Sequence, residues 1–279
     1  MPAPAELKAL IDQMPDHEKN GLLPKDIDKE RIEKAIAQIA EGGRPYVLGI
    51  LDRLLPPGKG DDSKPHYALH VLGVHLSQLE DDAPRRQFGQ ALASRLGDDT
   101  PVGVRKYLCQ ELGTAGGAEA VPALGKLLTD SELCEPAARA LVAIREGAAQ
   151  QLRAARPRTR ARNRVTIVQN LGVLADEQAL EALREALGDS SQDVRIAAAW
   201  ALANIGDADS ADRLLKAADT HKGWERIQET KACLLLAEKL LGADRKADAQ
   251  RIYKHLRDTR TADAEKYVRE AAEAALAAI

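Results

Sequence analysis

The sequence predicts an all-α protein, a right-handed α-solenoid of stacked helix hairpins, and three observations lead to this prediction. The 279 residues are 44% hydrophobic but only 3% aromatic, so Ala, Leu, Val and Ile must fill the interior, as suits closely stacked helices. Apolar residues recur at helical spacing, and no stretch alternates as a half-buried strand would. The chain also repeats itself about every 30 residues, which is typical of solenoids.

The repeat is clearest in the segment Val194–Gly206, which has apolar residues at helical spacing and ends on a glycine. Four leucines match in successive steps of 31, 30 and 29 residues going backwards: Leu202, Leu171, Leu141 and Leu112. Three arginines match in the same register: Arg195, Arg164 and Arg105. The pair Val268-Arg269 begins a last copy, whereas near Leu234 and Leu235 the register is ambiguous by a residue or two.

A second helix is expected after each first one. Leu183 matches Leu124 and Leu214 at offsets of 59 and 31 residues, and the links between pairs contain Gly, Asp and Ser, which end or cap helices. A single hairpin cannot bury its apolar stripe, whereas stacked hairpins bury each other's. We therefore expect one solenoid over residues 27–279, with about seven helix pairs and a closing helix.

The helix bounds are less sharply defined at the two ends and in the early helix pairs. Residues 1–26 are expected to form a cap helix, Ala3–Met14, and a polar linker that contains Pro24. Prolines in first turns mark two early pairs: Lys29–Glu41 with Pro45–Leu55, and Pro65–Leu79 with Pro84–Leu96. The closing helix, Ala262–Ile279, has a buried stripe of Val268, Ala272, Ala275 and Ile279. This leaves no room for a separate catalytic domain.

Charge and composition argue against several classes of protein. The net charge of −3 removes the global attraction of a general nucleic-acid binder, so nucleic acid is an unlikely partner. Cys109, Cys134 and Cys233 are far apart and predict buried thiols rather than disulfides or zinc ligands. No apolar run approaches the ~20 residues that span a bilayer, so no membrane association is expected. We expect a cytoplasmic protein, although a secreted one without its leader peptide would look the same.

The segment Asp189–Gly206 reads Asp-x-x-x-x-Val-Arg-x-x-Ala-x-x-Ala-Leu-x-x-Ile-Gly, which resembles the HEAT-like repeats also found in phycobilisome lyase proteins. The resemblance is close over residues 98–279 and loose over 27–97. It implies an armadillo-like helical scaffold that binds a protein or peptide on a concave face lined by the second helices. It also implies a ladder of Asp and Arg side chains between neighbouring repeats, at Asp189, Asp193, Arg195, Arg105, Arg164 and Arg269.

The residues predict no catalytic centre, no cofactor and no metal. His66 and His70 share a helix face near Asp61 and Asp62 and could hold a metal ion, but His75 lies off that face and no third ligand is well spaced.

The other candidate groups are weaker. His221 and His255 stand in polar, surface-type surroundings, and no base is placed beside a serine or cysteine. The lone pair His17-Glu18 does not match the repeated His-Glu pairs of an iron hydroxylase built on HEAT repeats. Trp200 and Trp224 are expected to fill the core or the space between repeats.

One unit departs from the repeat. Arg153 and Pro157 occupy positions where the repeat offsets call for leucine, so the second helix of that unit must end early. Six arginines fall within twelve residues there: Arg153, Arg156, Arg158, Arg160, Arg162 and Arg164. Arg164 is assigned to the ladder. The other five are either a solvated face or a site for an anion or an acidic partner.

The sequence therefore favours a non-enzymatic scaffold for protein–protein interaction. The alternative is nucleic-acid or phosphate binding through the Arg153–Arg164 segment, and a third hypothesis is an enzyme or lyase subunit. The sequence sets neither the oligomeric state nor the partner.

Overall fold

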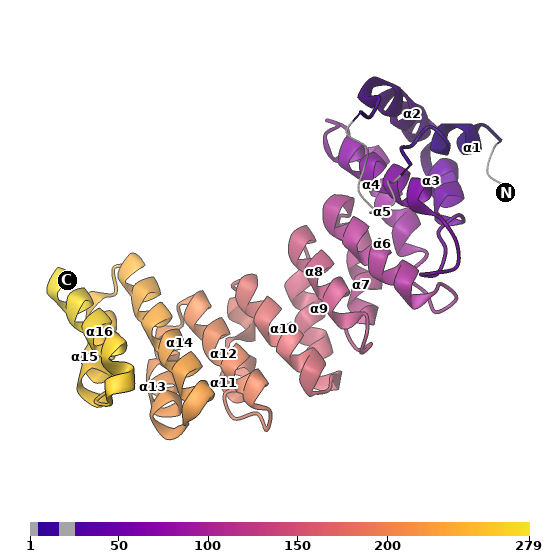
Figure 1. Ribbon diagram of the computed structural model, residues 1–279. Helices are drawn as coiled ribbons and strands as arrows, with labels where there is room; N and C mark the ends of the chain where they lie inside the picture. The colour runs from indigo at the N-terminus through magenta and orange to yellow at the C-terminus, as the bar shows by residue number, and fades with distance from the viewer. Residues whose placement is uncertain (1–4, 17–25) are drawn as a thin grey trace. The chain divides into compact units, whose positions relative to one another are not determined.

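The computed structural model describes residues 5–16 and 26–279 (Figure 1). The pair His17-Glu18 and the predicted linker around Pro24 lie outside these ranges. Within them the chain forms sixteen α-helices joined by turns and short 3-10 segments, and no strand. The all-α prediction is confirmed. None of these helices combines the length and apolar character needed to cross a membrane.

The chain groups into two compact units, residues 1–151 and 152–279, here called unit 1 and unit 2. The helices that begin in unit 1 are α1 (Ala5–Ile11), α2 (Lys29–Glu41), α3 (Gly43–Leu51), α4 (Ser63–Ser77), α5 (Asp82–Ala93), α6 (Val102–Ala115), α7 (Val121–Leu127), α8 (Cys134–Ile144) and α9 (Ala148–Ala155). Those of unit 2 are α10 (Ala161–Val173), α11 (Leu180–Ala186), α12 (Gln192–Ile205), α13 (Ala211–Thr220), α14 (Gly223–Gly242), α15 (Lys246–Thr259) and α16 (Lys266–Ala278).

Each unit is built from two layers of helices. In unit 1, α2, α4, α6 and α8 pack side by side in one layer, and α3 packs on α5 in the other. In unit 2, α12 packs between α10 and α14 while α13 contacts α15, and α16 packs on α15. In chain order the described helices make seven pairs, from α2 with α3 to α14 with α15, followed by α16.

The early helices begin two residues before the prolines that were expected to start them. Pro45, Pro65 and Pro84 are each the third residue of a helix, in α3, α4 and α5. The amide groups of the first turn have no intrahelical partner, so proline is tolerated anywhere in that turn. In α5 the Asp81 side chain accepts a 2.9 Å hydrogen bond from the Ala83 amide and fixes the start.

The repeat register in unit 2 is regular. Helices α10, α12 and α14 begin 31 residues apart, so Leu171, Leu202 and Cys233 occupy one position, and all three are buried. This settles the register that the leucine-rich stretch of α14 had left ambiguous. Gly172 allows α10 and α12 to approach closely, because a Cβ atom there would lie 2.7 Å from the Ala201 Cα.

The early end of the helix before Pro157 is confirmed. Helix α9 ends at Ala155, the residues Arg156–Arg158 form a 3-10 turn, and α10 begins at Ala161. Arg156, Arg158 and Arg160 therefore lie in a short connection, whereas Arg153 lies in α9 and Arg162 and Arg164 lie in α10.

Candidate functional site

Arginine–carboxylate pairs join successive hairpins of unit 2 through their second helices. The Arg153 Nη1 lies 2.5–2.6 Å from the two carboxylate oxygens of Asp176. One repeat later, the Arg184 guanidinium binds both oxygens of Asp207 at 2.8 and 3.0 Å. Both members of this second pair stand 31 residues after their counterparts, so the pairing belongs to the repeat.

A second series of pairs joins the first helices to the following hairpins. Arg164 Nε lies 3.0 Å from Asp189, Arg195 binds Glu225 at 2.6 and 2.9 Å, and Arg226 binds Glu265 at 2.6 and 3.2 Å. The three arginines are again 31 residues apart. Arg164 with Asp189 is an Asp–Arg pair of the kind that the sequence suggested, whereas the sequence did not indicate Glu225, Arg226 or Glu265.

Four predicted ladder residues are placed differently from the simple Asp–Arg scheme. Arg195 contacts Asp189 only at its backbone oxygen, at 2.7 Å, and not at its carboxylate. The carboxylate partner of Arg195 is Glu225. Asp193 is exposed and has no ion pair within the described ranges. Arg105 pairs at 2.9 Å with Asp98, which lies just before its own helix, α6. Arg269 donates to the backbone oxygen of Ala262 at 2.9 Å.

The arginine cluster is partly satisfied within the chain. Besides Arg153, Arg156 is also paired, with Glu185 at 2.8 Å. Arg158, Arg160 and Arg162 are exposed, and none of them has a carboxylate partner in the described part of the chain; Arg158 only donates to the Ala154 oxygen at 3.3 Å. The surface open to an external anion is therefore three arginines, not the five that the sequence grouped.

The two candidate metal ligands on α4, His66 and His70, do not converge. The His66 Nε2 lies 3.0 Å from Asp62, whereas the His70 Nδ1 lies 3.1 Å from Glu111 on α6. Asp61 instead accepts a hydrogen bond from the Ser63 amide at 3.0 Å. Burial raises the pKa of Glu111, which has no exposed side-chain area, and the nearby His70 opposes that rise.

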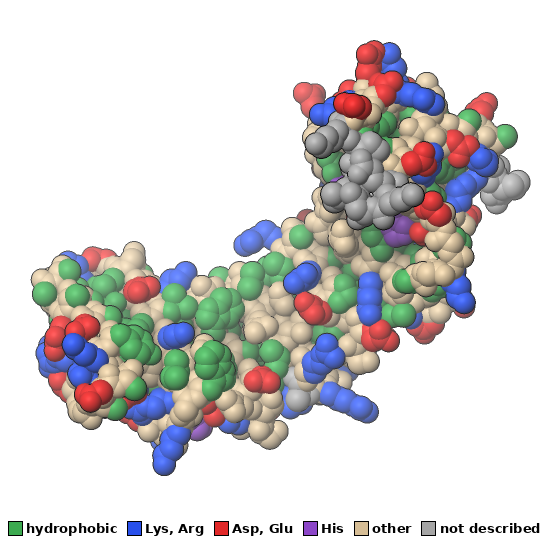
Figure 2. Space-filling model, viewed as in Figure 1, with side chains coloured by type: hydrophobic (Ala, Val, Ile, Leu, Met, Phe, Trp, Pro, Cys, Tyr) green, Lys and Arg blue, Asp and Glu red, His purple; other side chains and the backbone are tan. Residues whose placement is uncertain are grey.

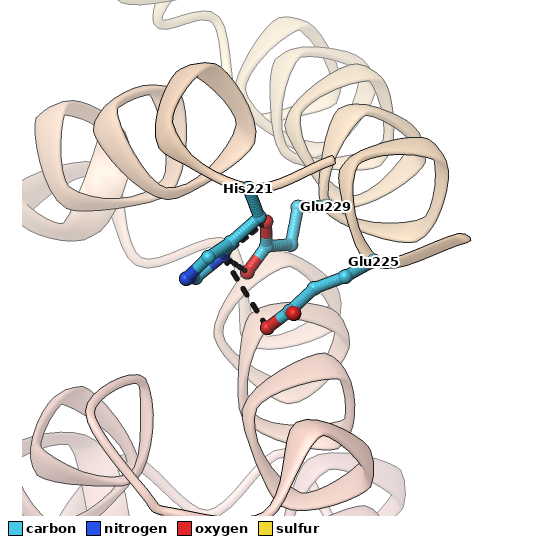
Figure 3. Close-up of side chains that lie close together, drawn as sticks. All are labelled: His221, Glu225 and Glu229. Carbon is cyan, nitrogen blue, oxygen red and sulfur yellow. Dashed lines mark hydrogen bonds and ion pairs between the residues drawn. The ribbon is translucent and has the colours of Figure 1, made fainter. Parts of the chain in front are cut away.

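In unit 2 a histidine and two glutamates do converge (Figure 3). His221 lies between α13 and α14, and Glu225 and Glu229 occupy the first two turns of α14. The His221 Nδ1 lies 2.9 Å from both oxygens of Glu229 and 3.3 Å from Glu225 Oε1. The side chain of His221 is 28% exposed and that of Glu229 is not exposed at all. The sequence interpretation of His221 as a surface residue was wrong.

The pKa values of the two carboxylates in this cluster are shifted in opposite directions. The Arg195 guanidinium holds the pKa of Glu225 below its ordinary value, against the effect of burial. Burial raises the pKa of Glu229, and the hydrogen bond from His221 only partly offsets that effect. Arg195 thus binds Glu225 directly, whereas it acts on Glu229 only through its charge and less than His221 does.

The register shows why the sequence did not reveal this cluster. Glu225 and Glu229 are 31 residues after Val194 and Ala198, which are fully buried apolar residues of α12. Aligning Arg269 with Arg226 places Val268 and Ala272, also buried, at the same two positions of α16. The spacing of four between His221, Glu225 and Glu229 was the available signal, but it becomes unusual only once the register is fixed.

A buried arginine organises the end of unit 2. Arg260 follows α15, is fully buried, and donates from Nη1 to Asp219 at 2.6 Å and to Thr259 Oγ1 at 2.8 Å. Its Nε lies 3.3 Å from Thr230 Oγ1 and 3.8 Å from Glu265. His255 also contacts Asp219, at 2.8 Å.

Exposed apolar side chains gather on unit 2 (Figure 2). Trp224 is 63% exposed, Tyr267 49%, Val173 45% and Ile227 40%. The expectation that Trp224 fills the core was wrong, whereas Trp200 is half-buried and lies against Gly172.

Comparison with known proteins gives one family match and several similar solved structures. The sequence model of the HEAT repeats matches residues 149–234. No curated protein matches. Solved structures that resemble the chain include the complex of CpcE and CpcF of phycocyanin lyase from Nostoc, at 18% identity and a TM-score of 0.41, covering 82% of this chain and 94% of that chain.

Two further solved structures are similar over nearly the whole chain. An engineered protein is 19% identical with a TM-score of 0.48, covering 97% of this chain and 77% of its own. Human deoxyhypusine hydroxylase in complex with glycerol is 20% identical with a TM-score of 0.34, covering 98% and 95%. These identities and TM-scores are low, so the assignment rests on the sequence match and on the repeat register. On these grounds residues 149–234 are HEAT-like repeats, in a chain whose described residues form stacked helix pairs.

Proposed function

We propose that this chain is a non-enzymatic scaffold that binds a partner protein or peptide on the first-helix face of unit 2, meaning the solvent-facing side of α10, α12, α14 and α16. The observation that carries the proposal is the placement of the large exposed apolar side chains of unit 2. Val173, Trp224, Ile227 and Tyr267 all belong to first helices.

The repeat register arranges these side chains in rows. Ile227 occupies the position of Val165 and Ile196, both half-buried, so an apolar residue recurs at one position of three successive helices. Tyr267 takes the position of Trp224 when Arg269 is aligned with Arg226. Aromatic side chains are frequent anchors of protein interfaces, and a repeated apolar row matches a partner segment that crosses several helices. The exposed side chains thus favour this face over the second helices that the sequence suggested.

Charge indicates the chemistry of the partner. Arg162 precedes Trp224 by two repeats and occupies the same exposed row, and Arg158 and Arg160 lie just before it. A partner with apolar side chains and a flanking acidic stretch would complement both features, because the arginine fork binds carboxylates with two parallel hydrogen bonds.

Replacing Trp224 and Ile227 tests the proposed face. Wild-type protein immobilised on beads should retain specific proteins from a lysate of the source organism, and the double variant Trp224→Ala/Ile227→Ser should lose most of them, because it removes the apolar anchors. Quantitative mass spectrometry of the retained proteins is the measurement. Leu79→Ser, at an exposed leucine of unit 1, is the matched control. Equal retention by all three proteins would contradict the proposal.

The arginines also leave a second candidate function, phosphate or nucleic-acid binding, which three unpaired exposed side chains favour. Arg158→Gln/Arg160→Gln/Arg162→Gln should leave the melting temperature within about 1 °C, since exposed charges contribute little to stability. Its affinity for heparin at low salt should fall severalfold if the segment binds polyanions, and the salt dependence of binding should become shallower by up to about three ionic contacts.

The matched control for this variant is Arg139→Gln, at an exposed arginine of unit 1 that pairs only with Glu135 on its own helix. Heparin affinity that is unchanged in the triple variant would show that the three arginines are a solvated face.

The non-enzymatic part of the proposal draws support from the thiols. Burial raises the pKa of Cys109 and Cys233 to about 12 and that of Cys134 to about 11, so all three stay protonated and poorly nucleophilic at neutral pH. Three free, buried cysteines also fit the reducing environment of the cytoplasm, where we place the protein.

A further inference from the structure

We infer that His221, Glu225 and Glu229 form a binding site for one divalent transition-metal ion of the zinc class. The ligand atoms of the three side chains lie within 4.8 Å of one another in unit 2 (Figure 3). None of its residues is among the exposed apolar side chains proposed to contact the partner.

The first argument is the free-energy cost of burying the two carboxylates. At the two positions of Glu225 and Glu229, the neighbouring repeats have Val194 with Ala198 and Val268 with Ala272, all buried. Burying an ionised carboxylate is costly unless it is paired, so apolar residues are the stable choice here. Two carboxylates in place of an ordinary core pair, both turned to one histidine, indicate a function other than packing.

The second argument is charge. Arg195 binds both oxygens of Glu225, whereas among the described residues the side chain that hydrogen-bonds Glu229 is His221. A cation bound between these side chains would balance the charge of Glu229, and the imidazole and the carboxylates are the groups that coordinate such an ion.

The third argument is geometry. Ligand atoms that share one tetrahedral zinc ion at about 2.1 Å lie about 3.4 Å apart. The His221 Nδ1 is 3.3 Å from Glu225 and 2.9 Å from Glu229, so small side-chain shifts would admit the ion. Three protein ligands leave a fourth position for water, and the exposed edge of His221 gives a path of entry.

The donor set selects the class of metal. An imidazole nitrogen with two carboxylates suits zinc and its neighbours, whereas magnesium and calcium prefer sites made of oxygen alone. Arg195 would then act as the outer partner that orients Glu225, as groups behind metal ligands commonly do.

Isothermal titration calorimetry with zinc chloride, on full-length protein first dialysed against a chelator, tests the inference. We expect one zinc ion per chain, a rise in melting temperature on binding, and no heat from magnesium chloride. Glu229→Ala and His221→Ser install the residues of the preceding repeat, Ala198 and Ser190, and each should weaken zinc binding at least about tenfold. Circular dichroism checks that the variants are folded.

The pair of His70 and Glu111 in unit 1 provides the matched control. His70→Ser removes a histidine that faces a fully buried glutamate but has no second carboxylate in reach, so its zinc affinity should equal that of the wild type. Three results would overturn the inference: no saturable zinc binding by the wild type, equal affinity in His221→Ser, or an equal loss in His70→Ser. A variant that fails to fold is replaced by the conservative Glu229→Gln, for which the same loss is expected.

Discussion

Removal of residues 262–279 is expected to cause aggregation or a loss of several degrees in melting temperature. Helix α16 packs on α15, and its Val268 and Ala272 are buried at 1% and 0% exposure. The deletion uncovers this apolar surface and also removes Glu265, the partner of Arg226. Buried side chains of this kind each contribute about 1–3 kcal/mol, so the combined loss is a large share of the stability of one domain.

Differential scanning calorimetry and size-exclusion chromatography measure this effect. The matched control is Lys266→Ala/Glu270→Ala, which removes an exposed ion pair from the same helix and should change the melting temperature little. A truncated protein that stays monomeric and melts like the wild type would show that α16 contributes nothing to the packing of unit 2.

Much of the fold follows from the sequence because the repeat constrains each element several times. The equivalence of Leu171 and Leu202 sets the first-helix register, and Pro157 alone predicts the end of α9. Helix starts are less well determined. A proline limits where a helix can begin only to within its first turn, and a capping side chain such as Asp81 selects the residue.

The ion pairs and the His221 cluster were harder to predict, because the length and direction of the side chains decide which of them meet. The acids that bind Arg153 and Arg156 lie 23 and 29 residues further along, Asp176 in a turn and Glu185 on α11. His221 also looked like a surface residue, since Glu225 and Glu229 become core positions only when α14 is aligned with α12. Arg260 stands in a polar stretch, and nothing local to it indicates burial.

Asp219→Ala is expected to lower the free energy of unfolding by about 3 kcal/mol, because it leaves a fully buried arginine without its nearest carboxylate. Arginine cannot lose its proton in a protein, so the charge of Arg260 remains buried in the variant. Thr259 and Thr230 still accept hydrogen bonds from it, and the remaining carboxylate, Glu265, lies 3.8 Å from Nε, further away than Asp219. Urea unfolding followed by circular dichroism is the measurement.

Two further variants separate this effect from ordinary surface changes. Asp212→Ala, at an exposed acid of the same helix α13 that pairs with Arg251, should change the stability by less than about 1 kcal/mol. Asp219→Ala/Arg260→Met should recover much of the loss, because it replaces a buried charge that has lost its nearest partner with an apolar side chain of similar length. A double variant as unstable as Asp219→Ala would contradict the role assigned to the charge.

The pH dependence gives an independent check on the same pair. Burial alone would raise the pKa of Asp219, but hydrogen bonds from Arg260 and His255 outweigh it and lower that pKa below its ordinary value of 3.8. A lowered carboxyl pKa contributes stability above the unfolded-state value, and this contribution is lost as the pH falls through the folded-state value. The stability gap between wild type and Asp219→Ala should therefore be constant near neutrality and narrow below about pH 4, when the wild type also loses the countercharge of Arg260. A gap that stayed constant into strong acid would mean that Asp219 stabilises Arg260 by packing rather than by charge.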